Sequence, residues 1–427
     1  MRVAQTTDAP TTGPDGTSAG WARRTVWTWA SAPLWARSAV VYLALRLVSG
    51  LLLAQAADQQ VWFPGITGPR EGDVDLALSW DAQWYQRIAD DGYPDTLPVG
   101  EDGRVQQNPW AFYPLFPYAA RFVGSVTGLD FATVAPLLAL LAGLGAALLM
   151  AQLLHETSPY ARTGPALAAV AVWAAFPASP VLQMAYTESF SMLLLVAFLL
   201  LLVRHRWWAA GAFALLLGIT RPIALPLSLV VVTAVWMRWR ERAERPIPVA
   251  ERAAIAAAVV ATGVSGVLWT TIAWWGTGRR DAYPATMTAW RGKAAIDPVE
   301  PWRKMIGYAF DYRTHDFVVP SLSMVLALVI SLVVLVPKVS PGTDLRLRVW
   351  CAAYAVYLLA VVDGNTSIVR YLVPLFPLAL VAVGAHRARP ARLWRVRTAF
   401  WVVAGIVGQV GWIWWLVLFT PPSDYPP

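Results

Sequence analysis

One carboxylate stands among aromatic residues in a long polar stretch that follows the first hydrophobic run. Asp81 lies in Trp80-Asp81-Ala82-Gln83-Trp84-Tyr85. Tryptophan and tyrosine favour the boundary between lipid and water. An acid held between them indicates chemistry at the surface of a membrane.

Further polar and ionisable residues stand next to apolar runs elsewhere in the chain. A charge at the centre of a bilayer costs about 2.5 to 3.5 kcal/mol on insertion scales, so such residues usually mark a functional site. The candidates that we expect at one face of the membrane are Asp81, Tyr85, Tyr113, Glu188, Arg221, Arg279, Arg280, His315, Asp363, Arg370 and Tyr371.

The composition is that of a membrane protein. Of 427 residues, 57% are hydrophobic and 14% charged, whereas soluble domains carry about 25% charged residues. The net charge is +8, but the arginines form short clusters between apolar runs, which is typical of membrane topology and not of nucleic-acid binding. Cys351 is the only cysteine, so an intrachain disulfide is excluded. Three lysines beside abundant Arg and Ala favour a bacterial source.

About eleven runs could cross a hydrocarbon core that takes roughly 20 helical residues. We expect an all-α polytopic membrane protein with a disordered cytoplasmic tail over 1–37, a transmembrane domain over 38–419 and an extracytoplasmic tail over 420–427. The first span would act as the signal anchor. Pro177, Pro180, Pro222 and Pro226 predict kinks or re-entrant turns. The predicted spans are 38–57, 131–153, 164–182, 186–203, 207–220, 222–238, 253–275, 317–337, 349–362, 371–386 and 398–419.

The arginine clusters predict the orientation of these spans. In the eleven-span arrangement every Arg-rich loop falls on one side, which the positive-inside rule assigns to the cytoplasm. The loops 58–130 and 276–316 then lie on the extracytoplasmic face, together with all the candidates above. The arginines concerned are Arg23, Arg24, Arg37, Arg204, Arg206, Arg238, Arg240, Arg242, Arg245, Arg252, Arg346, Arg348, Arg387, Arg389, Arg392, Arg395 and Arg397.

The segment around Asp81 has helical periodicity. Trp80, Trp84 and Ile88 recur every four residues, and Asp81 and Tyr85 share an adjacent line, so the helix could lie in the interface with its acid directed inward. An ordinary interfacial helix with an acid in its first turn would look the same. Likewise, the aromatic stretch from Phe112 to Pro117 would suit any chain entering a membrane.

Several motifs, taken in order, resemble the PIG-V family of GT-C mannosyltransferases over about residues 38 to 390. The resemblance implies a polyprenyl-phosphate-linked mannose donor and an active site on the extracytoplasmic or lumenal face. The matching motifs are Trp80-Asp81-Ala82-Gln83-Trp84-Tyr85 with Ile88-Ala89 and Gly92-Tyr93, Ala111-Phe112-Tyr113-Pro114-Leu115-Phe116-Pro117, Tyr186-Thr187-Glu188-Ser189, Thr220-Arg221-Pro222, and Arg370-Tyr371 with Pro374-Leu375-Phe376-Pro377.

The resemblance assigns roles to individual residues. It implies that Asp81 is the catalytic base and that Glu188 and Arg221 are the polar residues of their motifs. Trp84 stands where eukaryotic members that build GPI anchors tend to have His, and Ile223-Ala224 replaces an Asn-Gly-like pair. These departures leave the acceptor open.

Transfer of a sugar from a lipid phosphate needs a base on the acceptor proton and cations on the departing phosphate. Arginine binds phosphate oxygens in a bidentate manner, so Arg221, Arg370, Arg279 and Arg280 are candidates for the donor phosphate. Each could instead extend to lipid headgroups, an alternative that is favoured for Arg279 and Arg280. The residues expected to bind substrate are Trp80, Trp84, Tyr85, Tyr113, Glu188, Tyr371 and His315.

We predict no cofactor, while a divalent cation stays open because Asp73-Val74-Asp75 and Asp90-Asp91 provide carboxylates on the same face. Such a lone acidic motif is usually solvated surface, and His315 beside Asp316 is more often structural. Arg46, inside the first span, predicts a buried acid or a lipid phosphate as its partner.

The sequence favours an inverting glycosyltransferase that moves mannose from polyprenyl phosphate mannose to a lipid or glycan acceptor. A transporter or lipid flippase would also gather charges near spans, but it should place them near the midplane and show repeat symmetry. A GT-C enzyme that uses another lipid-linked sugar, such as arabinose or glucose, is a further alternative.

Overall fold

The computed structural model describes residues 29, 31–63, 66–67, 75–158, 163–293, 297–299, 303, 318–361, 367–387, 391–419 and 427. The chain divides into two units, Met1–Pro33 and Leu34–Pro427, and the second contains all of the described helices. In the described residues it is helical, with a single β-bridge between Val99 and Val105 and no strand.

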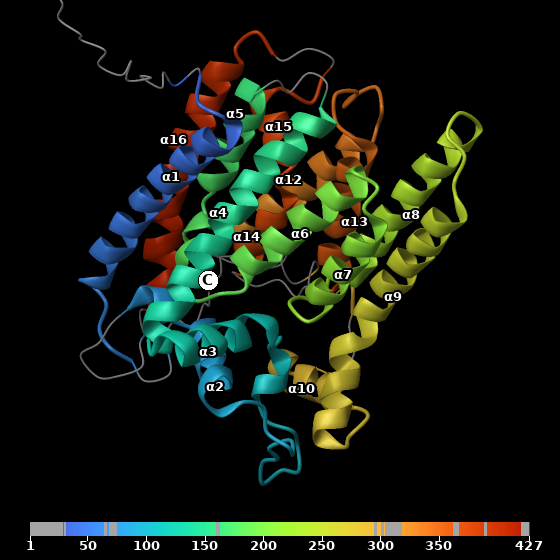
Figure 1. Ribbon diagram of the computed structural model, residues 1–427. Helices are drawn as coiled ribbons and strands as arrows, with labels where there is room; N and C mark the ends of the chain where they lie inside the picture. The colour runs from blue at the N-terminus through green and yellow to red at the C-terminus, as the bar shows by residue number, and fades with distance from the viewer. Residues whose placement is uncertain are drawn as a thin grey trace, which may run out of the picture. The chain divides into compact units, whose positions relative to one another are not determined.

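Its helices follow the chain as α1 (Leu34–Ala57), α2 (Asp81–Asp91), α3 (Leu115–Thr127), α4 (Phe131–Thr157), α5 (Thr163–Ala174), α6 (Glu188–Val203), α7 (Trp207–Gly218), α8 (Ala224–Arg240), α9 (Val249–Thr277), α10 (Ala282–Arg291), α12 (Val318–Val334), α13 (Leu345–Val361), α14 (Ile368–Tyr371), α15 (Leu378–Val383) and α16 (Trp394–Trp412) (Figure 1). Short 3₁₀ helices are η1 (Leu76–Leu78), η2 (Pro109–Ala111), η3 (Ser179–Gln183), η4 (Glu241–Ala243) and η6 (Val373–Leu375), and a π-helical turn, Ile413–Val417, continues α16.

Four helices of the described chain are long and apolar enough to cross a membrane. They are α1, α4, α9 and α16 with its π-helical turn, of 24, 27, 29 and 24 residues, and about 20 residues suffice. The protein is therefore an α-helical membrane protein. A helix also overlaps each of the other predicted ranges, but α5, α6 and α7 have only 12, 16 and 12 residues.

Proline breaks two of the predicted spans. The range 164–182 holds α5, which ends at Ala174, and then the 3₁₀ helix η3. The range 371–386 was wrong as a continuous helix, because α14 ends at Tyr371 and only η6 and α15 follow within the range. Proline lacks the N–H that an α-helix needs, and it disfavours helical geometry in the preceding residue. Pro374 and Pro377 explain the second break.

Arg46 stabilises the first of these breaks. Its guanidinium, 3% exposed, donates to the carbonyl oxygens of Ala174 and Ser179 and, at 2.9 Å, to Ser179 Oγ. Gln409 Nε2 adds a bond of 3.1 Å to the carbonyl oxygen of Ala175. The expectation of an acid or a lipid phosphate as the partner of Arg46 was wrong, because the carbonyl groups at the end of α5 need donors that the helix cannot supply.

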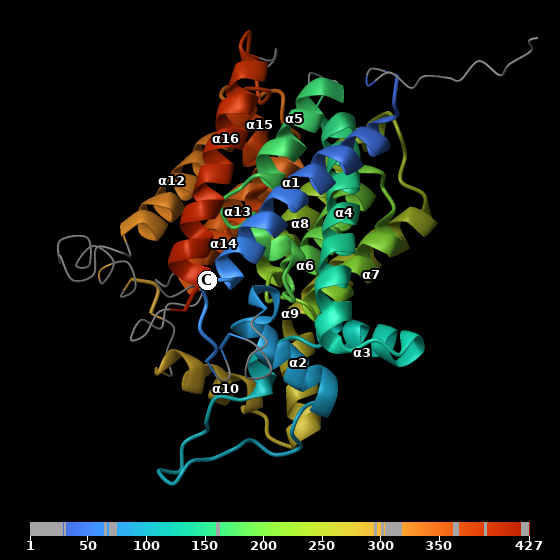
Figure 2. The same ribbon diagram turned by 90° about the vertical axis from the view of Figure 1, so that its left-hand side faces the viewer.

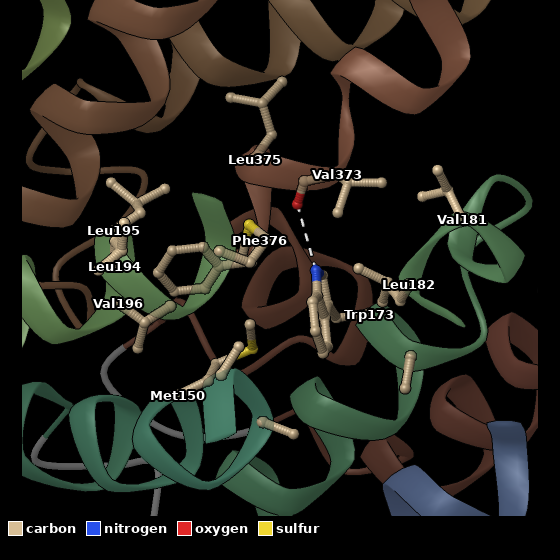
Figure 3. Close-up of a cluster of buried hydrophobic side chains, with 14 of the residues drawn as sticks. Met150, Trp173, Val181, Leu182, Leu194, Leu195, Val196, Val373, Leu375 and Phe376 are labelled. Atoms are coloured by element: carbon tan, nitrogen blue, oxygen red, sulfur yellow. Dashed lines mark hydrogen bonds between the residues drawn. The ribbon is translucent and has the colours of Figure 1, made fainter. Parts of the chain in front are cut away.

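The second break is held by three aromatic side chains. Trp173 Nε1 donates to the carbonyl oxygen of Val373 at 3.2 Å, within the apolar cluster of α4, α5 and α6 (Figure 3). Trp350 Nε1 donates to that of Pro374 at 2.8 Å, and Tyr354 Oη to that of Tyr371 at 3.0 Å. Irregular backbone is tolerated at membrane depth where protein satisfies its polar groups. These bonds fix the segment that carries Arg370.

Contacts gather several Arg-rich loops at one end of the helices. Arg204 pairs with Glu156 at 2.5 Å, Arg346 Nη1 donates to the carbonyl oxygen of Leu202 at 3.3 Å, and the N–H of Gly342 donates to that of His386 at 2.9 Å. These contacts join four loops, those after α4, α6, α12 and α15. The helices α2, α3 and α10 lie together at the other end (Figures 1 and 2).

Candidate active site

A tight turn places Asp81 at the start of α2. Trp80, the residue before it, has φ 59° and ψ −119°, a conformation that is rare for a bulky residue and that tends to occur at functional sites. The turn is fixed because Trp80 Nε1 donates to the carbonyl oxygen of Val417 at 2.9 Å and the Trp80 N–H donates to that of Ile66 at 2.7 Å. The predicted helix over this segment is confirmed, and Trp80 anchors it.

Four charged residues that are distant in sequence form one ion-pair network. Arg370 Nη2 lies 2.6 Å from Asp81 Oδ2, and Arg370 Nη1 lies 3.3 Å from Glu188 Oε1. Arg221 Nη1 lies 3.0 Å from the same Glu188 oxygen. The network holds two carboxylates and two guanidinium groups, so its formal charge is zero.

The network is mostly buried, and Asp81 is its most accessible member. The side chain of Asp81 is 23% exposed, against 15% for Arg221, 6% for Arg370 and 1% for Glu188. Charges that are removed from water interact strongly, because the surrounding dielectric is low. A molecule arriving from outside would therefore meet Asp81 before the arginines.

Each charged residue of the network occupies the end of a helix or a connection. Glu188 is the first residue of α6, and Arg370 lies in the four-residue α14. Arg221 lies in the turn between α7 and α8, which is tied to α3 because the N–H of Leu115 donates to the carbonyl oxygen of Ile219 at 3.1 Å. The charges therefore meet at helix ends and not along the middle of a helix.

Tyrosines pack against both guanidinium groups. Arg370 lies 5.1 Å from the ring centres of both Tyr186 and Tyr371, and Arg221 lies 5.4 Å from that of Tyr371. Such contacts between cations and aromatic faces stabilise the charge and orient its plane. They leave the edges of the guanidinium groups to bind oxygen atoms.

Tyr85 connects α2 to the same network as a neutral phenol. Its hydroxyl lies 3.3 Å from Thr187 Oγ1. Burial, followed by the negative charges of Asp81 and Glu188, raises the pKa of Tyr85 well above its usual range. The phenol therefore stays protonated and available as a hydrogen-bond donor or acceptor.

The network has unused hydrogen-bonding capacity. Among the described residues, Glu188 Oε2, Arg221 Nη1 and Arg370 Nε are buried without a hydrogen-bond partner. The 3.0 Å contact of Arg221 with Glu188 is thus an ion pair that lacks hydrogen-bond geometry. Buried polar atoms are usually satisfied, so these spare N–H groups mark the network as a place where a polar ligand could bind.

A second aromatic cluster joins α2 and α10 beside the network. Trp84 stacks on Phe112 with ring centres 5.7 Å apart and meets the edge of Trp290 at 5.1 Å. The hydroxyl groups of Tyr113 and Tyr283 lie 3.3 Å apart, and burial raises the pKa of Tyr113 well above its usual range. Trp84 and Tyr113 therefore connect elements that carry and flank Asp81.

Other predicted site residues lie apart from the network. Arg279 is exposed and bonds to Asp281 at 2.9 and 2.8 Å, and Arg280 stacks on Trp274 at 5.0 Å. In the described part of the chain no contact joins either residue to the four charges. His315 and Asp363 lie outside the described residues.

Asp75, the described acid of the motif considered for metal binding, caps a 3₁₀ helix. Asp75 Oδ1 accepts a hydrogen bond of 2.8 Å from the N–H of Ala77 and so caps η1, while Asp73 and Asp316 lie outside the described residues. Within the described ranges, no three His, Cys, Asp or Glu side chains are grouped as metal ligands would be.

Tyr186, Thr187 and Ser367 also contact site residues, although the sequence predicted no individual role for them. Ser367 Oγ lies 3.4 Å from Arg370 Nη2, and Tyr186 and Thr187 contact Arg370 and Tyr85. The signal for two of them was present, since Tyr186 and Thr187 immediately precede Glu188 in its motif. Nothing in the sequence near Ser367 distinguishes it.

Comparison with protein-family models finds no match to this chain. Comparison with curated proteins finds no match either.

Proposed function

We propose that this protein is an inverting glycosyltransferase of GT-C architecture that transfers mannose from polyprenyl phosphate mannose to an extracytoplasmic hydroxyl group. The observation that carries the proposal is the network of Asp81, Glu188, Arg221 and Arg370. It combines an accessible carboxylate with two oriented guanidinium groups. The reaction needs these two kinds of group, and the resemblance to the PIG-V family points to the same four residues.

In this proposal Asp81 is the general base. An oxygen of its carboxylate takes the proton of the acceptor hydroxyl while the acceptor oxygen attacks the anomeric carbon of the donor. The bond between that carbon and the phosphate oxygen breaks, and its electron pair stays on the phosphate. The products are a mannoside of inverted configuration, a polyprenyl phosphate and a protonated Asp81.

Arg221 and Arg370 would stabilise the phosphate as it leaves. Because both guanidinium groups are already oriented, they need little reorganisation when negative charge develops on the phosphate. Tyr186 and Tyr371 supply that orientation through their ring faces. Glu188, 1% exposed and in contact with both arginines, positions them, and we propose this role in place of the substrate-binding role that the sequence predicted for it.

The proposed orientation of the protein in the membrane follows from the end of the helices at which the Arg-rich loops lie. The Arg-rich loops gather at one end, and the positive-inside rule assigns that end to the cytoplasm. The network then faces outward, together with α2, α3 and α10. Nucleotide sugars are cytoplasmic, so a sugar carried on a lipid is the donor that suits this face.

The transporter or flippase alternative has less support. Transporters bind their substrates near the bilayer midplane, within broken helices related by repeats. In this protein the four charges occupy helix ends, and Asp81 belongs to an 11-residue helix outside the longest apolar helices. An enzyme that uses another lipid-linked sugar remains compatible with the same four residues.

The experiment that tests the proposal is a transfer assay with the full-length protein. Purified protein would be incubated with radiolabelled polyprenyl phosphate mannose and an extract of membrane lipids and cell-envelope glycans. We expect label to appear in an acceptor other than the donor. If the preparation transfers no mannose but does transfer label from a polyprenyl phosphate carrying arabinose or glucose, that sugar would replace mannose in the proposal. Failure with every lipid-linked sugar, together with transport of a lipid across the bilayer of proteoliposomes, would contradict the enzyme.

A further inference from the structure

We propose that Asp81 and the donor phosphate compete for Arg370, so that binding of the donor frees Asp81 to act as a base. This inference rests on the proposed function and adds an order to it. The donor must bind before the acceptor hydroxyl can lose its proton. Arg370 then exchanges one oxyanion partner, Asp81, for another, the donor phosphate.

The geometry of Arg370 makes the two partners mutually exclusive. Its Nη2 is 2.6 Å from Asp81 Oδ2, and its Nη1 is 3.3 Å from Glu188 Oε1. Its guanidinium carbon lies 5.1 Å from the ring centres of both Tyr186 and Tyr371. Nη2 also lies 3.4 Å from Ser367 Oγ, and Nε is buried, so the nitrogen beside the partly exposed Asp81 is the Nη2 that this carboxylate already contacts. A phosphate oxygen that binds there in a charge-assisted hydrogen bond must take the place of the carboxylate.

The charge of the network favours exchange over simple addition. Two carboxylates and two guanidinium groups cancel in the network as it stands. A phosphodiester adds one negative charge, and like charges close together in a buried site are costly. If the phosphate takes Arg370, both arginines stay paired, and the uncompensated carboxylate is Asp81 at the accessible edge.

A carboxylate released from Arg370 is free to act as a base. In the network Asp81 Oδ2 accepts a hydrogen bond of 2.6 Å from Arg370 Nη2, so this oxygen is already engaged. Asp81 offers both oxygens to an acceptor hydroxyl only after a donor phosphate is in place. Proton removal from an acceptor is thus coupled to the presence of the sugar to be transferred, which limits futile deprotonation of a bound hydroxyl group.

Asp81, and not Glu188, is the residue that can exchange. Glu188 is 1% exposed and contacts both arginines, whereas Asp81 is 23% exposed and contacts one. Separating Glu188 from its partners would leave buried charges without compensation. Asp81 can turn toward water when its partner is taken.

The inference makes an unusual prediction for Asp81→Asn. If Asp81 competes for Arg370, removing its charge should tighten phosphate binding even as it abolishes transfer. We expect a Kd lower by about tenfold, the ratio that corresponds to the lower end of one charge-assisted hydrogen bond. Asp81→Ser, whose side chain is too short to reach Arg370, should show the same direction.

The assay is equilibrium binding of radiolabelled farnesyl phosphate to the full-length protein in an uncharged detergent. Farnesol serves to subtract partition of the isoprenoid chain into micelles. The matched control is Asp95→Asn, which removes the same charge from an exposed position shortly after the same helix and should leave the Kd close to that of the wild type.

The outcomes separate the inference from the proposed function. An unchanged or higher Kd in Asp81→Asn and Asp81→Ser, with clear binding by the wild type, would overturn the competition and leave the enzyme intact. An equal tightening in Asp95→Asn would also overturn it, because the effect would then reflect net charge alone. If the wild type and all variants bind farnesyl phosphate no better than farnesol, both the inference and the phosphate site of the proposed function are overturned.

Discussion

Glu188→Gln tests whether the buried carboxylate is the common counter-charge of the site. Glutamine keeps the volume of the side chain and removes its charge. Glu188 is 1% exposed and lies 3.0 Å from Arg221 and 3.3 Å from Arg370, so its loss leaves one positive charge in excess within the buried network. Removing one partner of a buried ion pair costs about 3 to 5 kcal/mol. We expect a loss of stability in that range.

Glu156→Gln is the matched control for this change. Glu156 pairs with Arg204 at 2.5 Å, but the two side chains are 26% and 46% exposed. Exposed ion pairs contribute about 0 to 1 kcal/mol. The same substitution should therefore have a much smaller effect at the other end of the helices.

The free energy of unfolding would be measured by titration with sodium dodecyl sulfate from mild micelles, for both variants and for Glu188→Gln combined with Arg221→Gln. The double variant removes the excess charge, so we expect it to be more stable than the additive effect of the two changes. Equal losses in Glu188→Gln and Glu156→Gln, or strict additivity in the double variant, would refute the account of Glu188 as a shared counter-charge.

Three further predictions test the helices that position the site. In Gly218→Ala the added Cβ would lie 2.6 Å from the carbonyl oxygen of Ser265, so the same titration should show a free energy of unfolding lower by about 1 to 3 kcal/mol. Gly263→Ala, with open space around its Cβ, should be neutral or slightly stabilising, and equal effects of the two changes would contradict the packing of α7 on α9. Arg46→Met should destabilise the protein by about 1 to 3 kcal/mol for each carbonyl group left unpaired at the end of α5. Leu47→Met, at an exposed position on the same helix, should have little effect. An Arg46→Met variant as stable as the wild type would show that those hydrogen bonds are dispensable. In a Cys351→Ala background, single cysteines at Asp102 or Asp297 should react with a membrane-impermeant thiol reagent in intact cells, and one at Arg242 only after permeabilisation; the reverse pattern would place the network in the cytoplasm.

Local sequence signals predicted the parts of the site that depend on neighbouring residues. The four-residue recurrence around Asp81 gave the helix α2, and the apolar runs gave α1, α4, α9 and α16. The sequence predicted that Asp81, Glu188 and Arg370 share one face, but not that they form ion pairs with one another. Their convergence at one face followed from topology, but which arginine meets which acid depends on how distant helices pack.

Tertiary packing also explains what the sequence did not predict. Arg46 bonds to carbonyl groups because α5 ends at Ala174, and the partner of a buried arginine cannot be read from the helix that carries it. Arg279 pairs with Asp281, which follows it by two residues. The partner of Arg279 in this structure is therefore a neighbour in the sequence. Trp80, predicted to bind substrate, also donates its indole N–H to the carbonyl oxygen of Val417, a contact that no local sequence pattern indicates.

The central claim is that Asp81 removes the acceptor proton while Arg221 and Arg370 hold the donor phosphate. Its most direct test compares the wild type, Asp81→Asn and Asp95→Asn for transfer of radiolabelled mannose from polyprenyl phosphate mannose to the acceptor, with each protein shown to be folded by its unfolding titration. The amide of Asn keeps the size of the carboxylate but cannot take a proton, and a general base typically contributes about 10² to 10⁴-fold to the rate. We predict that Asp81→Asn is folded and loses transfer by at least about 10²-fold, while Asp95→Asn, a change at an exposed position, transfers like the wild type. Transfer by folded Asp81→Asn at the rate of the wild type would contradict the claim.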